Sequence, residues 1–329
     1  MNFFEAQDYT SYMNLKETQI AIKLLKDSFE AFLSSELNLM RVTAPLFVTV
    51  DTGLNDNLNG IEQAVNFTSQ EIPNKTVEVV HSLAKWKRQA LADYQLLPGE
   101  GLYTDMNAIR KDETLDNLHS IYVDQWDWEL IIEEKDRNID FLQNTVRKIY
   151  QSFKHIQDLA VRRYPWLPAT LPADITFISS QNLENKYPNL TPKQREHEIT
   201  KQHKAVFIMG IGETLQSGSP HDLRAPDYDD WQLNGDIIFW FEQLNMPMEV
   251  SSMGIRVDKN ALNRQLKSQK LDYHNKLLSG ELPLTIGGGI GQSRLCMYFL
   301  NKIHIGQVQA SLWDDKTKQI CKEKGIRLL

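Results

Sequence analysis

The stretch that decides the fold lies near the C-terminal end and reads Thr285-Ile286-Gly287-Gly288-Gly289-Ile290-Gly291-Gln292-Ser293-Arg294-Leu295. Four of the five residues at positions 287–291 are glycines, which let a backbone approach a ligand closely. The apolar run at 295–300 predicts a buried helix, with Arg294 in its first turn. A strand-like start, a glycine turn and an arginine at the beginning of a helix indicate an anion or nucleotide site. The stretch alone fits equally well a glycine-rich turn that packs a helix on a sheet.

The spacing of these glycines differs from the dinucleotide fingerprint G-x-G-x-x-G, because no glycine follows Gly287-x-Gly289 at the required position. The pattern is instead Gly289-x-Gly291-x-x-Arg294. It resembles the third signature motif of class II aminoacyl-tRNA synthetases, in which the arginine lies against the adenine and phosphates of ATP. The resemblance implies that Gly289 and Gly291 let a nucleotide lie close to the sheet.

The composition indicates a globular protein whose main partner is not nucleic acid. The chain has 329 residues, of which 41% are hydrophobic and 24% charged, typical of one large domain or two. Its formal net charge is -7, whereas proteins dedicated to nucleic acid are more often basic. The two cysteines, Cys296 and Cys321, have neither a disulfide framework nor metal-ligand spacing.

The sequence predicts a cytoplasmic protein without a membrane partner. The residues Met1-Asn2-Phe3-Phe4-Glu5 do not combine a basic region with an apolar one, as a signal peptide does. No apolar run approaches the roughly 20 residues needed to cross a bilayer. Two cysteines without a disulfide pattern suit a reducing compartment.

A long helix and a strand are predicted near the N-terminus. Residues 15–37 place apolar side chains at helical spacing. Residues 39–48 predict a strand in which Pro45 cannot donate to a ladder and so marks an edge or a boundary. This pair resembles the first class II motif, which forms the dimer interface in that family. The resemblance implies a homodimer through this helix and strand, and an ordinary helix–strand pair is the alternative.

A helix predicted to begin after Ser82 carries a lysine on its inward face. Lys87 shares a helical stripe with leucines four residues before and after it, whereas Lys85 and Arg88 point elsewhere. A lysine on a buried face needs an anionic partner. The alternative is a lysine that extends along an apolar surface and keeps its charge in water.

Residues 99–110 and 120–129 predict two strands joined by a polar loop. In the second strand, a period of two places Gln125, Asp127 and Glu129 on one face, as expected of a strand whose far end lines a pocket. This arrangement resembles the second class II motif, whose arginine holds the α-phosphate and the substrate carboxylate. Arg110 is the matching residue, although the usual Arg-x-Glu is here Arg110-Lys111-Asp112-Glu113.

Two segments rich in polar residues are predicted to be loops. Residues 51–60 are dense in Asn, Asp and Gly, and they include Asp56. Residues 222–231 are acidic and aromatic, so they fit either a solvated loop or a site for an amine, a ribose or a metal. Residues 139–163 and 260–278 predict two further helices.

Residues 234–241 and 248–257 predict a hairpin that carries two carboxylates. Asp236 and Glu249 could meet across it, and paired carboxylates are natural Mg²⁺ ligands. Strict alternation turns Ser252 to the opposite face from Glu249. A bulge in the second strand is therefore needed if both are to face one site.

The whole set of motifs resembles most closely the ammonia-dependent asparagine synthetase (aspartate–ammonia ligase) family. The segments that carry the resemblance are His81-Ser82-Leu83-Ala84-Lys85-Trp86-Lys87-Arg88-Gln89, Tyr122-Val123-Asp124-Gln125-Trp126-Asp127-Trp128-Glu129, Arg224-Ala225-Pro226-Asp227-Tyr228-Asp229-Asp230-Trp231 and the glycine stretch. The likeness runs from about residue 10 to residue 313. It implies an α+β class II synthetase-like fold, with a mainly antiparallel sheet flanked by helices. It also implies one catalytic domain over residues 1–329, without an anticodon-binding domain.

The family's reaction joins L-aspartate and ammonia at the expense of ATP. The side-chain carboxylate of aspartate attacks the α-phosphate, a β-aspartyl adenylate forms and pyrophosphate leaves. Ammonia then attacks the acyl carbon and gives asparagine and AMP. Two anions that associate in this way need cationic neutralisation and alignment, which arginines and Mg²⁺ supply.

The resemblance implies a role for each matching residue. The residues implied in the chemistry are Asp56, Arg110, Gln125 and Arg294, of which Asp56 would handle ammonia. Aspartate would be held by Ser82, Lys87, Asp127, Asp229, Ser252 and Arg256. The nucleotide would be held by Arg110, Asp236, Glu249, Gly289, Gly291 and Arg294. Asp236 and Glu249 would bind Mg²⁺.

Two rival functions follow from the same motifs. One is a class II aminoacyl-tRNA synthetase, or a paralogue that adenylates an amino acid for another acceptor. The acidic charge and the absence of a recognisable anticodon-binding barrel count against it. The other is a non-catalytic module that binds a nucleotide. The presence of Arg110, Asp236, Glu249 and Arg294 counts against that reading.

Overall fold

The structure is a computed structural model that describes residues 9–56, 62–268 and 270–329. The segment Met1–Glu5, for which the sequence predicts no signal peptide, lies outside the described residues. So do residues 57–60 of the predicted loop at 51–60. Within the described part, no helix combines the length and the apolar character that crossing a bilayer requires.

An eight-stranded sheet forms the centre of the protein, in the order β1-β5-β6-β11-β10-β9-β8-β7. Its strands are β1 (Leu39–Arg41), β5 (Gly101–Ile109), β6 (Tyr122–Ile131), β7 (Thr176–Ser179), β8 (Ala205–Met209), β9 (Asp229–Phe241), β10 (Met246–Arg256) and β11 (Thr285–Gly291). The outermost pairs, β1/β5 and β7/β8, are parallel, and all other neighbours are antiparallel. The predicted mainly antiparallel α+β architecture is therefore confirmed.

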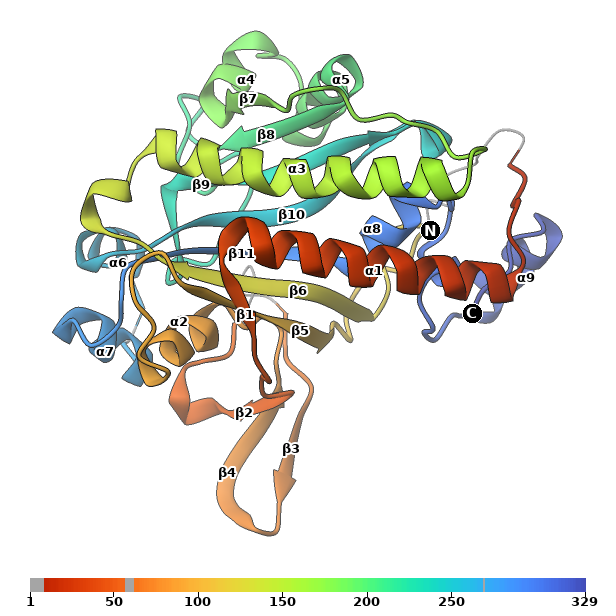
Figure 1. The fold of residues 1–329 in the computed structure, drawn as a ribbon. Coiled ribbons are helices and arrows are strands. Elements are labelled where there is room, and N and C mark those ends of the chain that lie inside the picture. The colour runs from red at the N-terminus through yellow and green to blue at the C-terminus, as the bar shows by residue number, and fades with distance from the viewer. Residues whose placement is uncertain (1–8, 57–61, 269) are drawn as a thin grey trace.

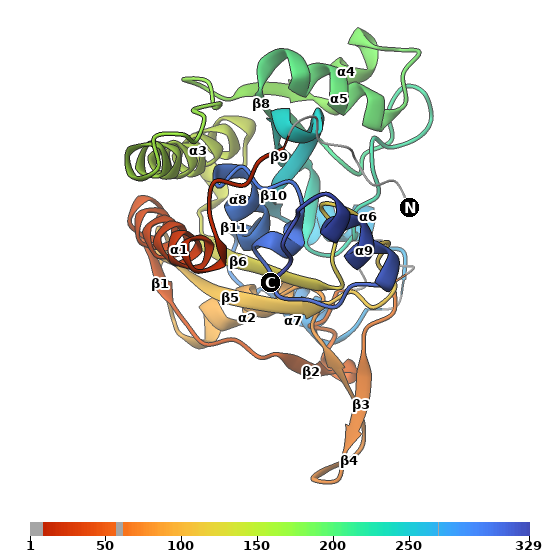
Figure 2. The ribbon, with the colours of Figure 1, turned by 90° about the vertical axis from the view of Figure 1, so that its right-hand side faces the viewer.

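Two long helices, α1 (Leu15–Leu37) and α3 (Ile139–Arg163), run next to each other across one face of the sheet (Figures 1 and 2). Asn14 and Asn138 cap their N-termini by accepting backbone hydrogen bonds. The main core lies between these helices, α8 (Gln292–Phe299) and the sheet. Phe29 packs on Trp126 of β6, with ring centroids 4.9 Å apart. This side of the sheet is therefore filled by apolar side chains.

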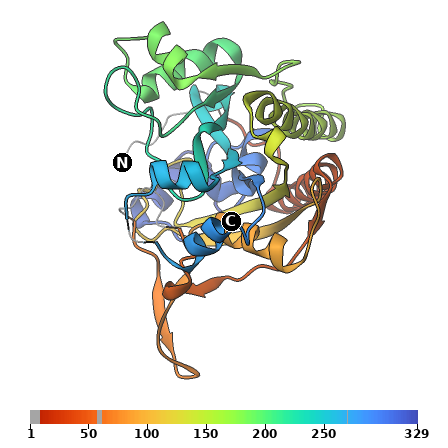
Figure 3. The ribbon, with the colours of Figure 1, turned by 90° about the vertical axis from the view of Figure 1, so that its left-hand side faces the viewer.

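The opposite face of the sheet is covered more sparsely. α2 (Ala84–Asp93) contacts β5, β6 and β11, and α6 (Lys259–Gln265) and α7 (Asp272–Ser279) form an apolar cluster beside it (Figures 1 and 3). The remaining helices are α4 (Ser180–Lys186), α5 (Pro192–His203) and α9 (Asp315–Glu323). This second face carries the polar side chains of β6 and β10.

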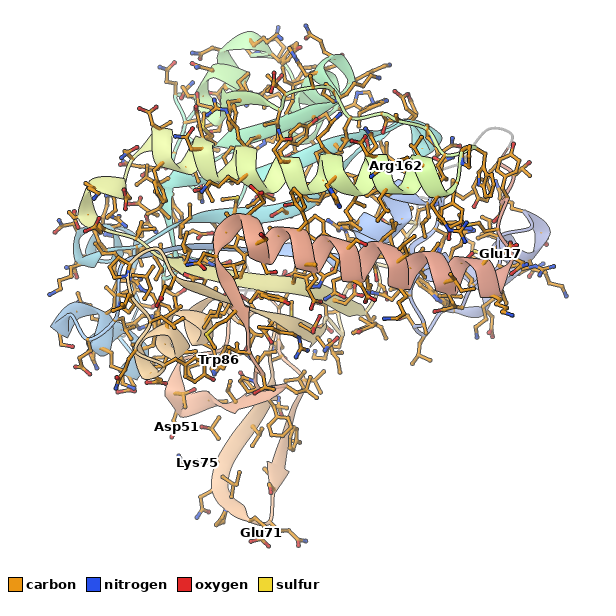
Figure 4. The ribbon with its side chains drawn as sticks, in the orientation of Figure 1. Glu17, Asp51, Glu71, Lys75, Trp86 and Arg162 are labelled. Carbon is orange, nitrogen blue, oxygen red and sulfur yellow. The ribbon has the colours of Figure 1, made fainter. Side chains whose placement is uncertain are left out.

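A second, three-stranded sheet forms an arm that projects from the body (Figures 1 and 2). Its strands are β2 (Phe47–Thr49), β3 (Asn66–Ser69) and β4 (Ile72–Val79), in the order β2-β4-β3. Glu71 lies at the tip, and Lys75 binds Asp51 at 2.8 Å along the side (Figure 4). For this region the sequence predicts a strand at 76–80, which covers only the second half of β4, because the arm lacks an apolar face with a clear period.

Two predicted elements are divided in the structure. The strand predicted at 39–48 is β1 and β2, which belong to different sheets, since Pro45 cannot continue a ladder. The helix predicted at 260–278 is α6 and α7. Leu266 ends α6 in an extended conformation and buries its side chain in the apolar cluster. The helices predicted at 15–37 and 139–163 have the predicted bounds.

Candidate active site

The glycine stretch is a central strand rather than a turn. Gly287 to Gly291 belong to β11, and none of these glycines has a positive φ. β11 lies between β6 and β10, so Gly289 stands opposite Asp127 on one side and Ser252 on the other. The predicted glycine turn is therefore wrong. An extended chain without side chains forms the floor between two polar strands.

Glycine is required in β11 because polar side chains of β6 lean over it. A Cβ atom at Gly287 would lie 1.9 Å from Oε2 of Glu129. A Cβ atom at Gly289 would lie 2.5 Å from Oε1 of Gln125 and 2.9 Å from Oδ1 of Asp127. Both distances to Gly289 are shorter than real Cβ contacts. The space that side chains at positions 287 and 289 would need is therefore taken by the polar side chains of the site.

A buried charge network forms one end of the site. The Arg256 guanidinium donates to both carboxylate oxygens of Glu129, at 2.7–3.1 Å, and also binds Asp229. The Lys87 ammonium lies 3.2 Å from Asp127 and 3.8 Å from Glu129. It also donates to the backbone carbonyls of Trp128 and Gly288, at 3.0 Å each. The predicted inward direction of Lys87 and its anionic partners are confirmed.

The pKa values in this network depend on burial and on the partner charges. Burial raises the pKa of Asp229, although Arg256 opposes it. Burial also acts to raise the pKa of Glu129, but Arg256, Lys87 and a hydrogen bond from Thr285 outweigh it and lower that pKa. Burial lowers the pKa of Lys87 despite its acidic neighbours. The network therefore retains an ionised carboxylate at Glu129.

Lys85 and Arg88 are buried as well, contrary to the expectation that they point away from the interior. Lys85 binds Asp227 at 2.9 Å. Arg88 donates to the carbonyls of Val257 and Pro283, at 2.8 Å each. A single helical period could not predict this, because α2 is covered on a second side by α7 and the segment before β9.

The other end of the site carries two arginines with fewer partners. Arg110 follows β5 and lies 4.0 Å from Glu113, and its side chain is 28% exposed. Its Nε is buried, without a hydrogen-bond acceptor among the described residues. Arg294, in the first turn of α8, donates to the backbone carbonyl of Glu249 at 2.9 Å. The fold therefore places both guanidinium groups in the site without pairing either of them closely with a carboxylate.

Asp236 and Glu249 form a negative pair on β9 and β10. A register shift between Glu249 and Ser251 confirms the predicted bulge and brings Ser252 opposite Asp236. Burial and the charge of Glu249 raise the pKa of Asp236 to about 6, although the ion pair with Arg224 opposes them. Burial acts to raise the pKa of Glu249, but Arg294 and Arg224 outweigh it and lower that pKa. Arg224 was not predicted.

The pair suits a divalent cation that is also held by phosphates. Mg²⁺ is commonly bound by one or two carboxylates together with substrate phosphates. The described residues contain no cluster of three or more His, Cys, Asp or Glu positioned for a metal. The raised pKa of Asp236 reflects excess negative charge, which a cation would relieve. The residues therefore fit such an ion in the presence of a nucleotide.

Two adjoining cavities collect the predicted residues. One cavity, of about 210 Å³, has Arg294, Gly291 and Glu249 among its lining residues. The other, of about 280 Å³, has Lys87 and Arg256 among its lining residues. The residues that line both are Arg110, Gln125, Glu249, Ser252 and Gly289. The predicted residues that line one cavity alone are Asp56, Ser82, Lys87, Asp127, Asp229, Arg256, Gly291 and Arg294.

Asp236 is the one predicted residue that lines neither cavity, because Arg224 lies against its carboxylate. Three further residues of the site were not assigned from the sequence: Glu129, Arg224 and His81. Glu129 shares the strand face of Asp127, so the period of two could have found it. The acidic segment around Arg224 is packed rather than solvated, since Asp227, Asp229 and Asp230 are buried.

Solved structures similar to this fold include tRNA synthetases. Asparaginyl-tRNA synthetase from Pyrococcus horikoshii, complexed with asparaginyl-adenylate, superposes with a TM-score of 0.65 at 14% identity, covering 90% of this chain and 70% of that one. Asparaginyl-tRNA synthetase from Entamoeba histolytica, with the same adenylate, gives 0.60 at 12% identity and covers 93% and 71%. At these identities the likeness establishes the class II synthetase fold.

Sequence comparisons identify the family. The family described as aspartate-ammonia ligase matches residues 16–325. An aspartate–ammonia ligase from Clostridium perfringens is 56% identical over 332 residues, covering 99% of each chain. Another from Fusobacterium nucleatum is 56% identical over 327 residues, covering 98% of this chain and 99% of its own. The chain therefore belongs to the aspartate–ammonia ligase family.

Proposed function

We propose that the protein is an ATP-dependent ligase that makes L-asparagine from L-aspartate and ammonia and releases AMP and pyrophosphate. The observation that carries this proposal is the pair of adjoining cavities on one glycine floor. One cavity offers a paired charge network for an amino acid, and the other offers arginines for a nucleotide. Arg110, Gln125 and Ser252 lie where the two meet, which is where a carboxylate would face an α-phosphate.

The cavity lined by Lys87 and Arg256 suits aspartate. Asp127 would accept hydrogen bonds from the substrate ammonium, with Asp229 nearby. Lys87 and Arg256 would attract the substrate carboxylates, while Ser82 and Ser252 would add hydrogen bonds. The network is already paired without substrate, so binding requires little rearrangement of charged groups.

The cavity lined by Arg294 suits ATP. Gly289 and Gly291 line this cavity, and the nucleotide would lie close to β11 there. Arg110 would stabilise the charge that develops at the α-phosphate when the substrate carboxylate attacks it. Glu249 and Asp236 would hold Mg²⁺, which when bound neutralises phosphate charge.

The second half of the reaction would take place beside Asp56 and Gln125. Both line the cavity that contains Lys87, and Asp56 is buried. Ammonia would attack the acyl carbon of the adenylate, and AMP would leave. Asp56 would position the incoming nitrogen or accept its proton, and Gln125 would orient the acyl group.

We further infer a homodimer formed through α1 and β1. β1 is the edge strand of the large sheet, and Met40 on it is half exposed, as is Ile20 on α1. Exposed apolar side chains next to an unpaired strand edge support an interface with a second copy. A single catalytic domain over residues 1–329, no anticodon-binding domain, no nucleic-acid partner and a cytoplasmic location stay predictions.

One assay tests the function. The protein is incubated with ATP, Mg²⁺, aspartate and ammonium, and AMP and asparagine are measured, with reactions that lack ammonium or aspartate as controls. We expect equal amounts of AMP and asparagine, both dependent on aspartate. Aspartate-dependent AMP without asparagine would refute the ligase. The appearance of aspartyl-tRNA after addition of tRNA would favour the synthetase alternative.

A further inference from the structure

A small cavity of about 60 Å³ adjoins the site behind Arg110. Among its lining residues are Glu62, His81, Arg110, Asp112 and Glu113. Glu62, His81 and Arg110 also line the cavity that contains Lys87, so these three residues lie between the small cavity and the proposed substrate site. A water molecule needs about 10–15 Å³ of such space, so the small cavity can hold a few molecules of that size. We call it the vestibule.

His81 is a buried residue that lines the vestibule. It is 1% exposed, and within the described ranges neither ring nitrogen meets a protein group in hydrogen-bond geometry. Burial and the charge of Arg110 lower the pKa of His81, although the Asp56 carbonyl and nearby carboxylates oppose them. A neutral imidazole offers one lone pair and one N–H. Because buried polar groups are normally hydrogen-bonded, such an imidazole is suited to bind a small polar ligand.

The backbone holds His81 next to Asp56. The side-chain oxygen of Asn55 accepts hydrogen bonds from the backbone N–H groups of both Asp56 and His81, each at 2.9 Å. Its amide nitrogen donates to Glu78 and to the carbonyl of Val79, at 3.0 and 3.3 Å. One amide therefore ties the loop that carries Asp56 to the strand end that carries His81.

The lining of the vestibule carries charges of both signs. Glu62, Asp112 and Glu113 carry negative charge, and Lys111 is bound to Asp112 at 2.6 Å. A cleft lined by carboxylates raises the local concentration of a small cation. The positive charge of Arg110, in the same lining, favours the neutral form of any amine beside it. A lining with both signs of charge suits a ligand that arrives as a cation and continues as a neutral molecule.

We propose that the vestibule captures ammonium and that His81 takes a proton from it before ammonia reaches the acyl adenylate. The proposal rests on the ligase function proposed above and adds to it the route and the proton acceptor of the nitrogen substrate. Ammonium, at one heavy atom, fits within the cavity, and it suits the acidic side chains of the lining and the ring nitrogens of His81.

The proton balance is as follows. Ammonium gives one proton to a ring nitrogen of His81 and becomes ammonia. The ammonia lone pair forms the C–N bond to the β-acyl carbon. The adduct loses a second proton from nitrogen, for which Asp56 is the nearby carboxylate. The C–O bond to AMP then breaks, and AMP leaves with the electron pair. Both protons pass to water, and nothing is oxidised or reduced.

The test compares the two half-reactions in the same variant. Aspartate-dependent exchange of pyrophosphate into ATP reports adenylate formation, which needs no ammonia. For His81→Asn we expect the ratio of asparagine formation to exchange to fall by about 100-fold, as for loss of a general base. With hydroxylamine, which is unprotonated at neutral pH, we expect a much smaller fall. For Glu62→Gln we expect the KM for ammonium to rise by about tenfold.

His274→Asn is the matched control, since His274 is also buried but lines none of these cavities. Its ratio should equal that of the unmodified protein. An equal loss with ammonium and hydroxylamine in His81→Asn would overturn the proposal, as would an unchanged ratio. If a thermal melt shows that His81→Asn is unfolded, Glu62→Gln decides, and an unchanged KM for ammonium would refute capture. Absence of exchange in the unmodified protein would refute the proposed ligase instead.

Discussion

The two ends of the site handle charge in opposite ways. At the end that contains Lys87, Glu129 and Arg256, every one of these three side chains is at most 3% exposed and is bound to an opposite charge. At the end that contains Arg110 and Arg294, the arginines are partly open to solvent and are held by a backbone carbonyl or lie 4.0 Å from a carboxylate. The charged side chains at the first end are already ion-paired before a substrate binds, whereas the arginines at the second end remain available to an anion.

The difference follows from what each end is proposed to bind. Aspartate carries both signs of charge, so a network with both signs can accept it by small exchanges of partners. A triphosphate carries only negative charge, so the cations that meet it are most useful when carboxylates have not already neutralised them. Burial makes a lost partner costly at the first end, whereas solvent relieves such a loss at the second.

The largest expected effect on folding is at the paired end. Arg256→Met removes the cation between Glu129 and Asp229 and leaves both carboxylates buried. We expect the free energy of unfolding to fall by about 3–5 kcal/mol, because a broken buried ion pair leaves uncompensated charge. Urea denaturation measures it. Arg41→Ala, which breaks the exposed pair with Asp105, is the control and should cost less than about 1 kcal/mol. Equal losses would contradict the comparison.

At the open end we expect the reverse, a large loss of activity with little loss of stability. Arg110→Ala should lower aspartate-dependent pyrophosphate exchange by about 10²–10³-fold, since it removes a charge that would face the transition state. Its urea midpoint should stay close to that of the unmodified protein. Arg162→Ala, on the exposed side of α3 (Figure 4) and outside the lining of both cavities, is the control for loss of an arginine. Normal exchange in Arg110→Ala would refute the assignment.

The glycines of β11 give a graded test on one strand. Gly287→Ala places a methyl group 1.9 Å from Glu129 and 2.7 Å from Arg256, and should destabilise the fold by about 1–3 kcal/mol. Gly291→Ala meets nothing closer than 3.4 Å, at Arg294, so its stability should change by less than about 1 kcal/mol. Thermal melts would measure both. Similar losses at the two positions would show that the extended backbone, rather than the network, requires glycine.

The last expected effect is a pH dependence of stability at Asp236. Because the pKa of Asp236 in the folded protein is about 6, above its ordinary value, the folded state binds a proton more tightly than the unfolded chain does. Its contribution to stability is therefore present at low pH and is lost as the pH rises through about 6, by about 1–3 kcal/mol. Asp236→Asn should remove this slope in unfolding experiments between pH 4 and 7. An unchanged slope would place the titration elsewhere.

Sequence alone predicted the elements whose pattern is local and periodic. The helices at 15–37 and 139–163 have apolar stripes long enough to set both ends. The alternation in β6 correctly turned Gln125 and Asp127 to one face and Trp126 to the other, because a strand has a period of two. All of the residues that motif resemblance assigned to the site, except Asp236, line the two cavities. Glu129, Arg224 and His81 were not assigned.

Tertiary structure alone decided which charges meet. The pairing of Arg256 with Glu129 joins residues 127 positions apart, and no local pattern specifies it. The ion pair between Arg224 and Asp236 is likewise not specified locally, because Arg224 lies in a loop, and a loop has no periodic pattern. The number of glycines is visible in the sequence. Their role as a floor under Gln125, Asp127 and Glu129, however, depends on the order in which three strands pair. Strand order arises from long-range packing, whereas periodicity arises from the chain itself.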